Sequence, residues 1–102
     1  MAYTVTNTFV RPNTDVAWFT ASNSVRAHMK DEYGLNAASR TKNNFTSTES
    51  EDGLTLTNVS VFVNKAAFDT HTADSTNDTF ISQRTTYNRN NSIQRTVTVS
   101  GS

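Results

Sequence analysis

The spacing of apolar residues constrains this chain most, because it changes from a strand repeat to a helix repeat and back in each half. Residues 2–10 alternate threonine with a second row of mostly apolar side chains, which is the two-residue repeat of a β-strand. That row holds Tyr3, Val5, Asn7 and Phe9. Residues 15–33 carry an aromatic and aliphatic stripe at helical spacing, so we expect a helix that packs on a sheet. The stripe holds Trp18, Phe19, Val25, Met29 and Tyr33.

The middle of the chain predicts a β-hairpin. Residues 36–52 are polar, with Phe45 as the only large apolar side chain, so a strand there is expected at an edge of the sheet. An Asp-Gly pair, a strong hairpin signal, follows, and residues 54–63 then alternate as a further strand. The apolar positions of this strand change parity, which predicts a β-bulge near Asn58.

The last third of the chain predicts a helix broken in two and a final strand. Asn64 can cap a helical segment near 65–73, and Asp74, Ser75 or Thr76 can cap a second segment near 76–89. Residues 93–99 return to the two-residue alternation of a strand.

Two successive strand-helix-strand units predict a ferredoxin-like α+β fold, with element order βαββαβ. The right-handed crossover rule then places both helices on one face of a four-stranded antiparallel sheet. A chain of 102 residues buries one core, so we expect a single domain over residues 1–102. The other sheet face is expected to expose valine and leucine side chains, and a face-to-face homodimer would cover them.

Composition excludes several functional classes. Nine Lys plus Arg balance nine Asp plus Glu, so the chain has no net field to attract nucleic acid or an anionic membrane, and we expect neither as a partner. The chain has no Cys and only three Gly, which argues against thiolate metal sites and phosphate-binding loops. The N-terminus has no signal-peptide pattern, and we expect a cytoplasmic protein.

One stretch of the sequence resembles a known family. Residues 59–71, VSVFVNKAAFDTH, pass from a strand directly into a helix that opens with two small residues, an aromatic and then a histidine. This stretch, together with the strand segment TVTN at 4–7, resembles the antibiotic-biosynthesis monooxygenases, a family of dimeric α+β barrels. The resemblance implies a homodimer whose two sheets close into a barrel. It also implies a cleft for a hydrophobic substrate, with cofactor-free oxidation in some members.

A haem-degrading branch of that family provides a test for a cofactor. The branch uses an Asn of the first strand, a Trp of the third strand and an axial His on the second helix. Asn7 matches the first position, but Phe62 stands at the Trp position and residues 80–82 contain no His. The resemblance therefore does not extend to haem chemistry, and we expect no cofactor.

Five residues are candidates for lining a ligand cleft between sheet and helices: Asn7, Trp18, Tyr33, Phe62 and His71. His71 is the candidate general base, since histidine titrates near neutral pH and His28 is the only other histidine. Each candidate has an alternative role, with Asn7 as a satisfied structural amide, the aromatics as core and the histidines as surface or capping residues. No metal site is expected, because neither histidine has a second histidine three or four positions away.

Two hypotheses about function remain. The first is a non-enzymatic homodimeric module that binds another protein. Its Thr- and Asn-rich composition resembles small viral accessory proteins, which would place it in the host cytoplasm. The second is a cofactor-free monooxygenase or a protein that binds a small hydrophobic molecule. A pocket of about 300 Å³ or more that reaches Asn7 would favour the second hypothesis, and a filled core would favour the first.

Overall fold

The computed structural model describes residues 2–33 and 42–101. The elements are β1 Tyr3–Val10, α1 Asn23–Tyr33, β2 Lys42–Glu49, β3 Thr55–Phe62, α2 Lys65–Ala73, α3 Ser75–Asn90 and β4 Gln94–Gly101. This is the predicted βαββαβ order of the ferredoxin-like fold, with the second helix divided into α2 and α3 as the N-cap pattern predicts. The polar segment 36–52 contributes β2, and the described part of that segment confirms the expected strand.

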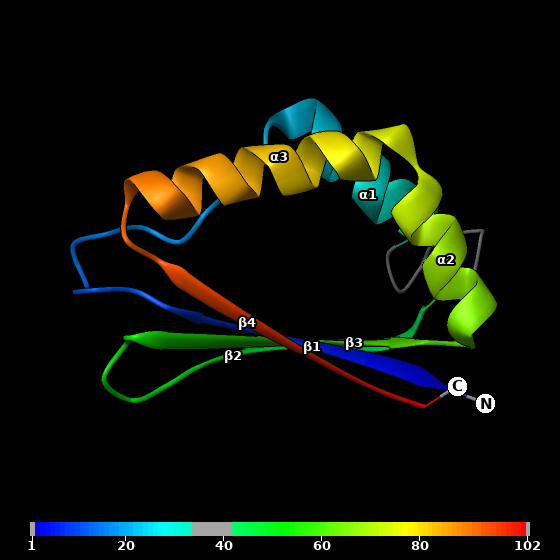
Figure 1. Ribbon diagram of the computed structural model, residues 1–102, viewed down its shortest axis with the longest axis horizontal. Coiled ribbons are helices and arrows are strands. Elements are labelled where there is room, and N and C mark those ends of the chain that lie inside the picture. The colour runs from blue at the N-terminus through cyan, green and yellow to red at the C-terminus, as the bar shows by residue number, and fades with distance from the viewer. Residues whose placement is uncertain (1, 34–41, 102) are drawn as a thin grey trace.

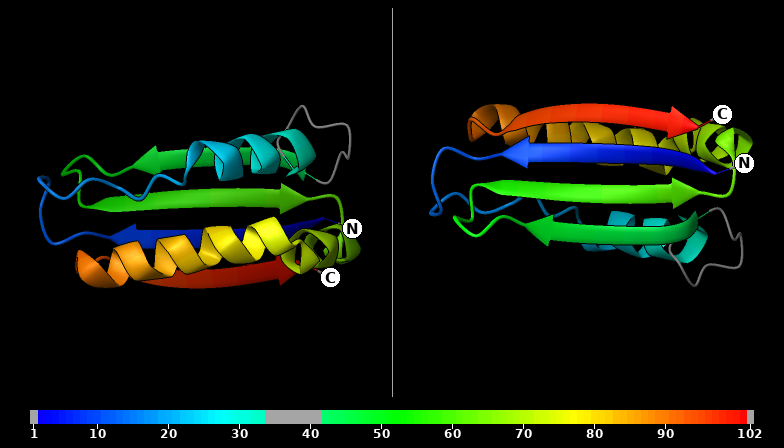
Figure 2. Two further views of the ribbon diagram at one scale, coloured as in Figure 1. Left: turned by 90° about the horizontal axis from the view of Figure 1, so that it is seen from above. Right: turned by 90° about the horizontal axis from the view of Figure 1, so that it is seen from below.

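The four strands form one antiparallel sheet in the order β2-β3-β1-β4. β2 is therefore an edge strand, as predicted for the polar segment. All three helices lie on one face of the sheet (Figure 1). In Figure 2, α3 runs above β1 and β4 and α1 lies above β2, whereas the view from below shows the four strands with no helix in front of them.

The strand pairing determines which side chains face the helices. In β1 the helix side carries Tyr3, Val5 and Phe9, which are all buried. Because side chains alternate along each strand, the register assigns every other residue of the neighbouring strands to the opposite side. We call this opposite side the helix-free face. Its described residues are Thr4, Thr6, Thr8, Val10, Thr46, Thr48, Thr55, Thr57, Val59, Val61, Gln94, Thr96, Thr98 and Ser100.

A small apolar core lies where α2 packs on the sheet. Tyr3, Val5 and Phe62 form the buried cluster, with Ala67 and Phe68 of α2 packed against it. The ring of Phe68 lies 5.1 Å from that of Tyr3 and 5.3 Å from that of Phe62, measured between centroids. These are ordinary spacings for aromatic pairs, so this end of the fold is well packed.

The two predicted N-caps are confirmed. The side chain of Asn64 accepts a hydrogen bond from the Ala67 backbone N–H at 2.8 Å and begins α2. Asp74 ends α2 and begins α3, and its Oδ1 accepts from the Thr76 backbone N–H at 2.7 Å. Each carboxamide or carboxylate oxygen satisfies a donor that the first turn of a helix leaves unpaired, which explains the break in the helix.

The predicted start of the first helix at residue 15 is wrong, because α1 begins at Asn23. The carbonyl groups that a helix would need are bonded elsewhere: Arg11 Nη1 donates to the Val16 oxygen at 2.8 Å, and the Tyr87 hydroxyl donates to the Ala17 oxygen at 2.6 Å. Both donors are side chains outside the segment. These side-chain contacts hold residues 15–22 in a loop, and Trp18 lies in that loop and not on a helix.

The predicted bulge near Asn58 is also wrong. β3 pairs with β1 without interruption from Thr55 to Phe62, and the irregularity in the sheet lies in β2 between Lys42 and Asn44. The apolar residues of β3 change parity because they change face. Leu56 points to the helix side, against our expectation that leucine lines the helix-free face, whereas Val59 and Val61 lie on the helix-free face.

Candidate functional site

A cleft of about 80 Å³ lies between the sheet and α3. Its walls come from β1, β3, α3 and the loop before α1. The lining residues are Phe9, Trp18, Phe19, Leu56, Asn58, Phe80, Arg84 and Asn88. The cleft is thus mostly aromatic and aliphatic, with two amides and one guanidinium.

The aromatic wall is held by contacts with α3 and the hairpin. Phe19 lies 5.7 Å from both Phe80 and Tyr87, measured between ring centroids. Trp18 Nε1 donates a hydrogen bond to Glu49 Oε2 at 2.7 Å, and this fixes the indole against β2. Two χ angles per ring are restrained in this way, so the wall is formed before any molecule enters the cleft.

Arg11 holds the loop and the hairpin together beside this wall. Its Nε donates to the Gly53 carbonyl at 2.7 Å, and its guanidinium lies 4.4 Å from the centre of the Trp18 ring. Nη2 also lies 3.6 Å from a carboxylate oxygen of Glu49. The charge of Arg11 is therefore neutralised and its donors are used, so its role is structural.

Arg84 differs from Arg11 because its charge has no counter-ion in the described part of the chain. Its guanidinium lies 5.7 Å from the centre of the Phe9 ring and 5.4 Å from that of Phe80. Its Nε is buried and has no hydrogen-bond acceptor among the described residues. Burial, followed by repulsion from Arg95, lowers the pKa of Arg84 to about 10, so the side chain is still charged at neutral pH.

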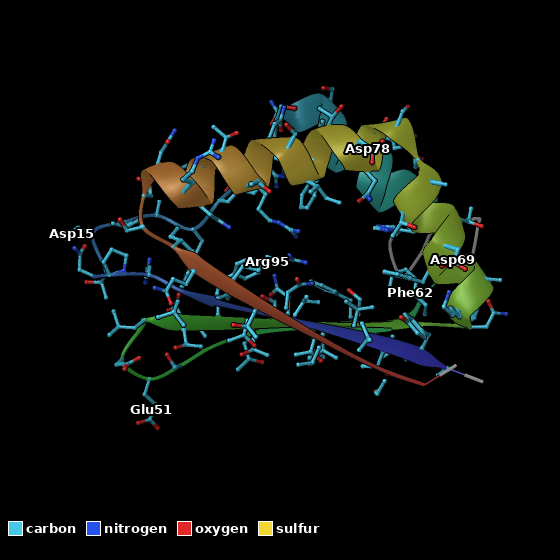
Figure 3. The ribbon with its side chains drawn as sticks, viewed as in Figure 1. Asp15, Glu51, Phe62, Asp69, Asp78 and Arg95 are labelled. Carbon is cyan, nitrogen blue, oxygen red and sulfur yellow. The ribbon has the colours of Figure 1, made fainter. Side chains whose placement is uncertain are left out.

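Arg95 brings a second positive charge to the same layer. It extends from β4 on the helix side of the sheet, between the strands and α3 (Figure 3). Its Nε donates to Asn7 Oδ1 at 2.7 Å, which satisfies the amide oxygen but leaves the charge without a carboxylate. Asn7 thus has the structural hydrogen bond that we considered as the alternative to a ligand-orienting role.

The five sequence-predicted candidates do not form one group. Trp18 lines the cleft, and Asn7 lies beside it, because β1 pairs Asn7 with the lining residue Asn58. Phe62 lies at the α2 end of the sheet (Figure 3). Its ring centroid is 5.4 Å from that of His71 in α2, and neither residue lines the cleft. The side chain of Tyr33 lies outside the described part of the chain.

The other histidine joins α1 to the junction of α2 and α3. His28 Nε2 lies 2.8 Å from Asp74 Oδ2, while the second oxygen of that carboxylate caps α3. Asp74 therefore serves two elements at once, and its contact with His28 links α1 to the start of α3.

Sequence reasoning missed Arg84 and Asn88, because charged and amide side chains on a helix are usually assigned to its solvent face. A signal was present in the spacing. Asn77, Phe80, Arg84 and Asn88 follow at intervals of three and four residues, so they share one stripe of α3. Asn77 and Asn88 are buried, which identifies the stripe as the inward side of the helix.

Two further classes of site find no support in the described residues. Over residues 2–33 and 42–101, no set of three or more His, Asp or Glu side chains is arranged to hold a metal ion. Within the same ranges, no helix combines the length and the hydrophobicity required to cross a membrane.

Comparison with known proteins gives similarity of fold only. No family model matches the sequence, and no curated protein matches it. A crystal structure of a dimeric ferredoxin-like protein from an uncultured marine organism superposes with a TM-score of 0.59 at 12% identity, over 97% of this chain and 92% of that chain. Rv0793 from Mycobacterium tuberculosis superposes with a TM-score of 0.51 at 16% identity, over 98% and 94% of the two chains.

Proposed function

We propose that this protein is a non-enzymatic homodimeric binding module in which the helix-free faces of two sheets pack together and close an α+β barrel. The absence of charge on that face is the observation that carries the proposal. None of its described side chains is charged, and nearly all are threonine or valine. The helix side of the same sheet, by contrast, carries Glu49 and Arg95.

This distribution is unusual for a sheet surface that faces water. Exposed surfaces of monomers normally mix charged residues of both signs, and the central parts of interfaces are depleted of charge. When a face meets its own copy about a twofold axis, a charge near the axis approaches its own copy and a charge elsewhere on the face is desolvated, so an uncharged face suits this kind of contact.

The sequence of β3 supports the same proposal. A strand with one covered face alternates apolar and polar residues, whereas a strand covered on both faces carries apolar residues at both parities. β3 has Leu56 and Phe62 on the helix side and Val59 and Val61 on the helix-free face. This pattern favours a strand whose second face is covered by another sheet. One of the solved structures with this fold is described as dimeric, which is consistent with such an arrangement.

A charge placed in the middle of the face tests the proposal. Val59 is paired between Thr6 and Thr46, so Val59→Lys would bring two lysines close together in a twofold dimer. Thr85→Lys changes another β-branched residue to lysine on the exposed surface of α3, and it is the matched control. Sedimentation equilibrium at micromolar concentration is expected to show dimers for the wild type and for Thr85→Lys, and monomers for Val59→Lys.

Circular dichroism would check that each variant keeps its secondary structure. A wild-type protein that sediments as a monomer would refute the proposal, and so would a folded Val59→Lys variant that dimerises as tightly as the control.

The cleft supports binding of a small molecule as a second candidate function. Its volume of about 80 Å³ is below the ~300 Å³ of a pocket for a drug-sized ligand, and Asn7 is not among its lining residues. The monooxygenase hypothesis has less support for this reason, and because its candidate base His71 packs against Phe62 away from the cleft. A ligand that fits here would be small, with a flat apolar part against the aromatic wall.

A further inference from the structure

We propose that the cleft under α3 binds the carboxylate of a small aromatic acid, with the Arg84 guanidinium as its main partner and Arg95 as a second positive charge nearby. This inference does not depend on the proposed homodimer, because every residue it uses lies on the helix side of one chain.

The first step is the charge balance of the cleft. The ion pairs formed in the described part of the chain use Arg11, His28 and Lys65, and none involves Arg84. Arg95 donates to a neutral amide. Among the described residues, the two guanidinium groups thus have no carboxylate partner in this layer. Arg84 is half-buried and Arg95 is exposed, so a bound anion would be stabilised mainly by the partly desolvated Arg84.

The second step is geometry. Arg84 lines the cleft, and its guanidinium is a planar fork of N–H donors that carries no acceptor atom. A carboxylate can accept two parallel N–H bonds from such a fork, which is the strongest common arrangement for this pair.

The third step is the choice of anion. Phosphate sites are usually built from several backbone N–H groups at a helix N-terminus or a glycine-rich loop. Arg84 instead lies in the middle of α3, Ser75–Asn90, and the rest of the cleft is aromatic or aliphatic. A volume of about 80 Å³ holds a carboxylate and part of a ring, and the rings of Phe9 and Phe80 offer flat apolar surfaces for that ring.

Titration of the full-length protein with benzoate tests this inference. Trp18 is the only tryptophan and lines the cleft, so its fluorescence reports binding, and calorimetry gives an independent affinity. Benzamide matches benzoate in shape without the charge, and inorganic phosphate at equal ionic strength tests the alternative anion. We expect saturable binding of benzoate, with benzamide and phosphate each at least tenfold weaker.

Two variants on the same helix locate the site. Arg84→Met is expected to weaken benzoate binding tenfold or more, whereas Arg89→Met, which changes an exposed arginine outside the cleft, is expected to bind benzoate like the wild type. Undiminished binding by Arg84→Met would overturn the inference. Equal affinity of the wild type for benzoate and benzamide would also overturn it, as would equal affinity for phosphate or a lack of saturable benzoate binding.

Discussion

Replacing Arg84 with methionine is expected to stabilise the fold in the absence of any ligand. The variant removes a buried Nε–H donor that has no acceptor among the described residues, a defect that costs about 1–3 kcal/mol. It also loses contacts of the guanidinium with the rings of Phe9 and Phe80, worth about 0.5–1 kcal/mol each. Methionine sulfur replaces part of that loss, since sulfur–aromatic contacts contribute about 0.3–1.5 kcal/mol.

The balance of these terms is a gain of about 1 kcal/mol in the free energy of unfolding, which corresponds to an increase in Tm of roughly 4–8 °C for a domain of this size. Helix propensity does not interfere, because arginine and methionine are nearly equal in this respect. Urea denaturation followed by Trp18 fluorescence measures the change, and Arg89→Met is the control for loss of a positive charge from α3.

A gain in stability on removing Arg84 would be consistent with the proposed anion site, because stabilising substitutions in a binding site often reduce binding. The reasoning would be refuted if Arg84→Met were less stable than the wild type by about 1 kcal/mol or more at an unchanged m-value. Such a result would mean that the packing contacts of Arg84 stabilise the fold by more than its unpaired donor destabilises it. A ligand would then not be needed to explain an arginine at this position.

Three further predictions concern the loop and the hairpin. Arg11→Ala is expected to lower the free energy of unfolding by about 2–3 kcal/mol, since it removes charged hydrogen bonds to the Gly53 and Val16 carbonyls. Chemical denaturation would reveal no change if these contacts were incidental. Gly53→Ala is expected to cost about 1–2 kcal/mol, because the φ of +73° disfavours a side chain, and an unchanged Tm would contradict this. Asp52 accepts hydrogen bonds from Ser50 and from the Leu54 backbone, and these lower its pKa below 3.8. Its contribution to stability is therefore present above pH ~4 and lost as the pH falls through the lowered pKa. The free energy of unfolding of Asp52→Asn should therefore fall less than that of the wild type between neutral and acidic pH. Parallel plots of unfolding free energy against pH for the two proteins would contradict this.

The elements that the sequence predicted well are those controlled by local chemistry. The alternation in β1 and the capping by Asn64 and Asp74 depend on interactions within a few residues, so a short stretch of sequence is enough to predict them. The edge position of β2 also follows from a local property, since a polar strand is tolerated where only one neighbour pairs with it.

The sequence-based errors arose where residues far away in the chain determine the local structure. The start of α1 depends on the Tyr87 hydroxyl, which bonds the Ala17 carbonyl across 70 positions of sequence. The parity change in β3 predicts a bulge only if its apolar residues all stay on one face of the sheet. The valines Val59 and Val61 lie on the opposite face of a regular strand.

The candidate site was only partly predictable for a related reason. Trp18 was chosen as an aromatic wall residue and does line the cleft. Arg84 was not chosen, because an arginine on a polar helix is normally solvated. The spacing of Asn77, Phe80, Arg84 and Asn88 marks one stripe of α3, but the sequence does not say that this stripe meets the sheet, which follows from the place of α3 over β1 and β4 (Figure 2).

The mass of the wild-type protein in solution tests the proposed homodimer most directly. Static light scattering across a range of micromolar concentrations should give twice the 11.3 kDa of one chain, with no dependence on concentration above the dissociation constant. A constant mass of 11.3 kDa over that range would contradict the account, since the uncharged helix-free face would then have no partner copy.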